Sequence, residues 1–210
     1  MDHRTVIWQA VHEERRALVS DLEGITPDQW QTPSMCRGWS VHDVVAHLTD
    51  SARTTRLGFA RQMVLARFDF DRANDDGVAK HKAPDPAQTL DAFRAATDCR
   101  DRPPGPLATR LVEAYVHGED IRRPLGIHRT YPVEHVTTAV AYMARTGAGL
   151  GGGRERVRGL RLCPDPGGRH IGDGPEVRGP AIALLLAVSG RPTAPGELTG
   201  DGVQILAARD

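Results

Sequence analysis

A glycine-rich run, GAGLGGG at residues 147–153, divides a chain whose hydrophobic pattern differs on its two sides. Before the run, apolar residues recur at intervals of three and four, which is the period of an amphipathic helix. After it, residues 156–164 alternate as a strand does. A phosphate-binding loop would need a preceding strand and a following Gly-Lys-Ser/Thr, so a flexible linker is the better interpretation. The pattern predicts a helical part followed by a small α/β part.

The helical part is predicted to contain five helices. The first spans 4–24, and the second runs from 40 to about 67, with Ser40 and Asp43 forming a variant capping box at its start. The third follows Pro86, and the fourth lies between the break at 103–106 and Pro124. The fifth spans about 133–146. Residues 69–85 are acidic and polar and are interpreted as a surface loop.

The α/β part contains two strands separated by a turn, then a helix in GPAIALLLAVSGR at 179–191, and a last strand in VQILA at 203–207. We therefore expect a helical bundle domain at 1–146 and an α/β domain at 154–210. The second domain is short and is expected to depend on the first for burial.

Composition excludes several classes of protein. The chain has 27 basic and 27 acidic residues, so it lacks the charge excess of a nucleic-acid binder. The longest apolar run, at 181–188, is too short to span a membrane, and the charged N-terminus has no apolar signal segment. Three separated cysteines, Cys36, Cys99 and Cys163, indicate reduced thiols. These features predict a soluble cytoplasmic protein.

The sequence LVEAYVHGEDIRRPLG at 111–126 carries the clearest candidate chemistry. Glu113 and His117 are four residues apart, so on a helix both side chains lie on one face and can bind one cation. A catalytic zinc site takes three protein ligands and keeps one position open, and His47, in GWSVHDVVAHL at 38–48, is the best third ligand. Nickel, iron and cobalt also suit this donor set.

Three segments resemble the mycothiol-dependent maleylpyruvate isomerase family of actinobacteria, within the DinB-like superfamily. They are TPSMCRGWSVHDVVAHL, LVEAYVHGEDIRRPLG and GPAIALLLAVSGR. The resemblance implies an α+β fold, with a DinB-like four-helix bundle and a small sterol-carrier-like α/β unit. It also implies a divalent metal held by His47, Glu113 and His117, and mycothiol as thiol co-substrate. The C-terminal part and the region between the second and fourth helices are short for the family.

Two functions are compatible with these features. The first is a metal-dependent isomerase or thiol transferase acting on a small electrophilic substrate. The second is a non-catalytic metal- or ligand-binding regulatory module of the same fold.

Several single residues also have two interpretations. Asp43 either orients His47 or only caps the helix. Asp50 and Asp120 could each substitute as a ligand, but are interpreted as solvated carboxylates. Cys36 could be a nucleophile, but is given a structural role because no histidine is spaced to activate it. Arg53 and Arg56 lie beyond the metal face and could receive an anionic substrate, but are interpreted as surface residues. Trp30 and Trp39 are expected to be core or staple residues.

Overall fold

The computed structural model of the protein describes residues 2–209 and contains two compact units, Met1–His128 and Arg129–Asp210. The sequence pattern predicts that residues up to 146 belong to the first part. In the structure, the helix α8 (Val133–Met143) packs against α10 (Ala181–Val188) and against the strand β1 (Arg161–Asp165), so it lies within the second unit.

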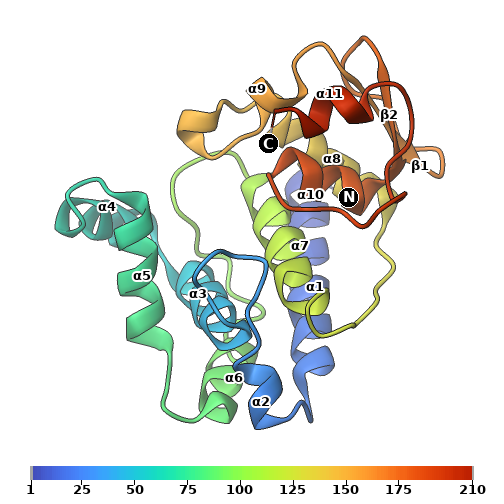
Figure 1. Cartoon of the computed structure of the whole chain (residues 1–210). Coiled ribbons are helices and arrows are strands. Elements are labelled where there is room, and N and C mark those ends of the chain that lie inside the picture. The colour runs from blue at the N-terminus through green and yellow to red at the C-terminus, as the bar shows by residue number, and fades with distance from the viewer. Residues whose placement is uncertain (1, 210) are drawn as a thin grey trace. The chain divides into compact units, whose positions relative to one another are not determined.

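The regular structure of the first unit is helical (Figure 1). Its helices are α1 (His3–Leu22), α2 (Pro27–Trp30), α3 (Val41–Arg53), α4 (Arg56–Leu65), α5 (Phe70–His81), α6 (Pro86–Arg94) and α7 (Thr109–Arg122).

Helix α3 is at the centre of this unit. It packs against α5, α6 and α7, and α1 packs along α7, as the blue and yellow-green ribbons of Figure 1 show. The apolar face of α3 is fully buried and meets side chains from α1, α6 and α7. The members of this core include Leu18, Leu22, Val41, Val44, Val45, Phe93 and Ile121. One face of α3 therefore forms the core, and the residues beside that face are free to form a site.

Two predictions for this unit are wrong. The helix expected from 40 to 67 breaks in two, because the Thr54 hydroxyl donates to the Asp50 carbonyl and Thr55 caps α4 by accepting from the Gly58 N–H. The expected loop at 69–85 contains α5. Its N-terminus is capped by Asp69, which accepts from the Arg72 N–H, and Val78 is buried. Packing against α3 stabilises this otherwise polar segment.

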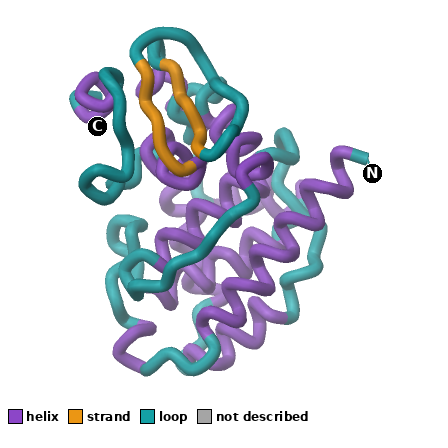
Figure 2. The backbone as a smooth tube through the Cα atoms, turned by 90° about the vertical axis from the view of Figure 1, so that its right-hand side faces the viewer, coloured by secondary structure: helices purple, strands orange, loops and turns teal. Residues whose placement is uncertain are grey.

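The second unit combines short helices with a small parallel sheet. Its elements are α8, the 3-10 helix η1 (Ala148–Leu150), α9 (Arg154–Val157), β1, β2 (Glu176–Pro180), α10 and α11 (Val203–Ala207). The two strands lie side by side, coloured orange in Figure 2, with Leu162 opposite Val177. Helix α10, buried along nearly its whole length, packs against both strands.

The predicted strand at 203–207 is a helix instead. The N–H of Arg178 donates to the Thr199 carbonyl at 2.8 Å, and the N–H of Thr199 donates back at 2.8 Å. The Gly202 N–H then donates to the Glu176 carbonyl, also at 2.8 Å. Because these bonds already occupy the edge of β2, the following residues have no strand to pair with and form the short helix α11.

The glycine run at 147–153 is a packed turn rather than a flexible linker. A Cβ on Gly152 would lie 2.0 Å from the Thr146 carbonyl oxygen, and one on Gly153 would lie 2.1 Å from the Val188 carbonyl oxygen. Both distances are far shorter than atoms tolerate, so these glycines are needed for close approach of the backbone.

No helix within residues 2–209 combines the length and apolar character that crossing a membrane requires.

Candidate metal centre

The first candidate ligand, His47, lies on α3 beside its buried face. Ser40 and Asp43 form the predicted capping box and start the helix, so the position of His47 follows from a local signal. Its ring is enclosed between two others: the ring of Trp39 is 5.0 Å away, centroid to centroid, and that of His117 is 4.9 Å away and close to perpendicular. The structure therefore brings together two of the predicted ligands, which lie on different helices and are 70 residues apart in the sequence.

Burial, and then the positive field of His117, lower the pKa of His47 to about 4. The ring is therefore neutral near pH 7, which is the form in which a histidine binds a metal. This shift could not be predicted from the sequence, because it depends on burial by other elements.

Glu113 and His117 both lie on α7, as the sequence predicted. The Glu113 side chain is only 16% exposed, and its Oε2 accepts from Arg110 at 2.8 Å. Its Oε1 is buried and has no hydrogen-bond partner among residues 2–209. Burial acts to raise the pKa of Glu113, but Arg110 and the two nearby histidines lower it to about 2. The group is thus a carboxylate with one oxygen left unpaired, an unfavourable state unless a cation occupies the site.

The orientation of His117 is set by a buried partner. Its Nδ1 donates to the Asp120 Oδ2 at 2.9 Å, and the Asp120 side chain is completely buried. Burial alone would lower the pKa of His117, but the bond to Asp120 and the contact with Cys36 raise it to about 10. A ring with this pKa carries a proton on both nitrogens near pH 7. Because Nδ1 is engaged by Asp120, Nε2 is the nitrogen that a metal would bind, and its proton would be released on binding. Asp120, interpreted from the sequence as a solvated carboxylate, is instead a buried partner of a candidate ligand.

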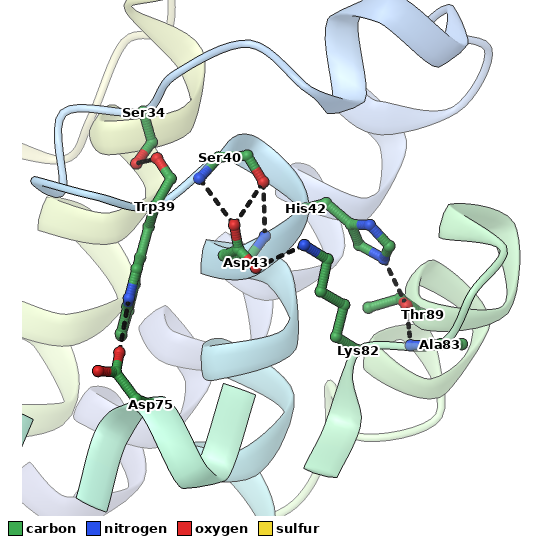
Figure 3. A network of polar contacts seen from close by, with 9 residues as sticks. All are labelled: Ser34, Trp39, Ser40, His42, Asp43, Asp75, Lys82, Ala83 and Thr89. Atoms are coloured by element: carbon green, nitrogen blue, oxygen red, sulfur yellow. Dashed lines mark hydrogen bonds and ion pairs between the residues drawn. The ribbon is translucent and has the colours of Figure 1, made fainter. Parts of the chain in front are cut away.

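Asp43, by contrast, does not orient His47. One of its oxygens accepts from the backbone N–H and the hydroxyl of Ser40, and the other accepts from Lys82 at 2.7 Å (Figure 3). Of the two interpretations left open by the sequence, the structure supports the helix cap.

Trp39 forms a wall of the candidate centre. Its indole Nε1 donates to the Asp75 carboxylate on α5 at 3.0 Å (Figure 3), and its ring faces His47. The residue is only partly buried, whereas Trp30 is 6% exposed and belongs to the core. Trp39 therefore connects α5 to the site, a role that its sequence position did not indicate.

Cys36 also lies at this centre. Its thiol donates to the Asp120 Oδ2 at 2.9 Å, and its sulfur is 3.5 Å from the His117 Nδ1. The structural role predicted for Cys36 rested on the lack of a histidine at a suitable spacing in the sequence. The structure places His117 beside it, 81 positions away, and no local spacing could reveal this contact. Within the described part of the chain, Cys36, His117 and Asp120 form the compact group whose possible ligand atoms all lie within 4.8 Å.

A second polar cluster lies at the end of α3. The Asp50 carboxylate is 9% exposed and accepts from Gln62 Nε2 at 3.1 Å, while His81 Nε2 lies 3.3 Å from its Oδ1. These three residues line a cavity of about 430 Å³ together with Arg53, which the sequence analysis interpreted as a surface residue. Sequence reasoning missed this cluster because His81 falls in the segment expected to be a loop.

In the helical first unit, the rings of His47 and His117 lie against each other, and both lie near enough to the Glu113 carboxylate to lower its pKa. The donor set fits a divalent cation, because one carboxylate oxygen lacks a partner and one histidine is neutral.

Residues 11–104 match the family model described as the mycothiol maleylpyruvate isomerase N-terminal domain. This part of the chain is similar to that domain, and the family resemblance seen in the sequence is confirmed.

The fold is shared with two solved structures, described as crystal structures of the mycothiol-dependent maleylpyruvate isomerase and of a histidine-to-alanine mutant. The TM-score is 0.61 at 17% identity for the former and 0.62 at 16% for the latter. Each comparison covers 94% of this chain and 91% of the other. The α+β class is thereby confirmed, and at this identity the likeness concerns the fold alone. No curated protein sequence matches the chain significantly.

Proposed function

We propose that this protein is a metal-dependent enzyme that activates a low-molecular-weight thiol for isomerisation of, or transfer to, a small electrophilic substrate. The thiol is mycothiol, on the strength of the family. The observation that carries the proposal is the buried, unpartnered Oε1 of Glu113 beside two histidines whose rings are 4.9 Å apart. The ligands are His47, Glu113 and the Nε2 of His117.

A divalent cation bound there would supply an open coordination position for the thiol sulfur and would favour its thiolate form. The chain's own residues prepare the site. Burial keeps His47 neutral, Arg110 keeps Glu113 ionised, and Asp120 holds the His117 ring by its Nδ1. Trp39 covers one side of His47 and limits access of water.

Thiol ionisation accounts for only part of the required rate. A thiol with a pKa of about 8.5 is roughly 3% ionised at pH 7, so full ionisation raises the nucleophile population about 30-fold at most. The rest must come from holding the substrate beside the sulfur, where orientation contributes roughly 7–11 kcal/mol. Cis–trans isomerisation, addition to an activated double bond and S-transfer are all compatible with this arrangement.

Metal analysis of ligand variants tests the proposal. We expect one divalent cation per chain in the unmodified protein and almost none in His47→Ala, Glu113→Gln or His117→Ala. The exposed His128 lies outside the site, and His128→Ala should keep the metal. Full occupancy in a Glu113→Ala, His117→Ala double variant would refute the ligand assignment. In the cobalt-substituted protein, mycothiol should produce a sulfur-to-cobalt charge-transfer band that His47→Ala lacks.

A second candidate function follows from the compact group Cys36, His117 and Asp120. A cation bound there would use the Nδ1 of His117 and the Cys36 thiolate, and would suit a non-catalytic, structural or regulatory site. Cys36→Ser separates the two candidates. It should leave the metal content nearly unchanged if Glu113 and His47 are ligands, and should abolish it if Cys36 is one.

A further inference from the structure

A large cavity lies within the second unit. It has a volume of about 1130 Å³ and is lined by α8, by residues 154–162 and by the loop 166–173. None of the candidate metal ligands is among the residues that line it.

Three arginines at this cavity have no acidic partner. Within residues 2–209, the side chains of Arg145, Arg158 and Arg169 make no ion pair or hydrogen bond, although all three line the cavity. Arg154, a fourth lining arginine, is paired with Glu155 at 2.8 Å. The lining also contains two carboxylates, Glu134 and Asp173, so positive charge is in excess and the free guanidinium groups remain available to an anion.

A buried hydroxyl supports a polar ligand. Thr137 on α8 is 8% exposed, and its Oγ1 has no hydrogen-bond partner in the part of the chain that the structure describes. The hydroxyl faces the loop, since a Cβ on Gly168 would lie 3.1 Å from it. Both residues line the cavity. A threonine in a helix commonly bonds a carbonyl of the preceding turn, so an unpaired buried hydroxyl indicates that its partner comes from outside the chain.

The glycine-rich loop 166–173 offers further donors. The backbone N–H groups of Gly167, Arg169 and His170 have no acceptor among the described residues. Arg161 donates to the Nδ1 of His170 at 2.7 Å, so the neutral ring carries its proton on Nε2 and is a donor there. Successive free N–H groups in a turn favour anion binding.

Part of the cavity wall is apolar. Val157, Leu160 and Leu162 line it and are between 1% and 7% exposed. Ligand pockets combine such an apolar wall with a few polar groups, and the apolar body of an organic molecule can contact this wall, as an inorganic ion does not. We propose that the cavity of the second unit binds a small organic anion, whose carboxylate or phosphate oxygens meet the arginines and the 166–173 loop and whose apolar body meets α9 and β1.

The proposal can be tested on the full chain by nuclear magnetic resonance titration with four probes: phthalate, phenyl phosphate, inorganic phosphate and neutral benzamide. We expect saturable shifts at Thr137 and at residues 167–170 with phthalate or phenyl phosphate, and the tighter of the two identifies the anionic group. Arg158→Gln and Arg169→Gln should each weaken binding about tenfold, the usual effect of losing one charge-assisted hydrogen bond. Thr137→Val, which keeps the side-chain shape, should weaken it severalfold.

Arg56→Gln is the matched control, because it removes the same charge from an exposed position on α4 and should leave binding unchanged. Equal binding of benzamide, equal weakening by Arg56→Gln, or no saturable shift with either organic anion would overturn the proposal. If inorganic phosphate bound as tightly as phenyl phosphate, the apolar wall would have no role and the assignment to an organic anion would be wrong.

Discussion

At the scale of single residues, the candidate centre depends on buried groups that orient its ligands. Asp120 is the clearest of these, because its carboxylate is fully buried, accepts from the His117 Nδ1 and also accepts from the Cys36 thiol. A carboxylate in this position fixes both the tautomer and the orientation of a ligating histidine.

Asp120→Asn tests this role, because asparagine keeps the shape of the side chain and loses its charge. We expect metal affinity to fall about 10- to 100-fold, measured by competition with a chelator of known affinity, while the far-ultraviolet circular dichroism spectrum stays unchanged. Total loss of binding would instead indicate that Asp120 is itself a ligand. Unchanged affinity would show that it has no part in the site.

At the scale of elements, capping side chains determine where the helices begin. Where the capping group is ionisable, its contribution to the free energy of unfolding depends on pH. Asp43 caps α3 together with Ser40 and also receives a bond from Lys82 (Figure 3). Burial acts to raise the pKa of Asp43, but the bonds from Lys82 and Ser40 outweigh it and hold the pKa below its usual value. An aspartate whose pKa is lower in the folded state stabilises the fold above its ordinary pKa of about 4. This contribution is lost as the pH falls through the lowered value.

Asp43→Asn should therefore lower the free energy of unfolding by about 1 kcal/mol at pH 7, because it removes the charge from the bonds that Asp43 accepts from Ser40 and Lys82. The difference between the two proteins should shrink as the pH falls below about 4. Urea denaturation at a series of pH values measures it, with the exposed Asp201→Asn as the control. A difference that stays constant down to the acid limit would exclude an ionised cap.

At the scale of the whole molecule, the division into two units falls in a short segment without regular structure. The residues that follow the C-terminal turn of α7, 127–130, include three exposed positions, and Arg129 begins the second unit. The two segments predicted to be a surface loop and a flexible linker, 69–85 and 147–153, are ordered instead. Residues 70–81 form helix α5, and Gly153 in the glycine run is buried.

Limited proteolysis with a protease of low sequence specificity should therefore cut first within about 127–131 and release two fragments that mass spectrometry can identify. We expect the fragment containing α1–α7 to persist longest, since it is the longer unit and has a continuous core of buried side chains. First cleavage inside α7 or within the glycine run would contradict this division of the chain.

The sequence alone determined those features that depend on neighbours within a few residues. Ser40 with Asp43 begins a helix where predicted, and the spacing of Glu113 and His117 places them on one helix face. These signals are local hydrogen bonds and helix periodicity, which act over three or four positions.

The tertiary structure decided everything that depends on contacts between distant segments. It set His47 against His117, placed the Cys36 thiol on Asp120, converted a polar stretch into α5, and prevented the last predicted strand by occupying the edge of β2. It also formed the arginine-lined cavity from segments with no shared motif. The physical reason is that burial and packing, rather than local propensity, determine these contacts, and both are properties of the assembled chain.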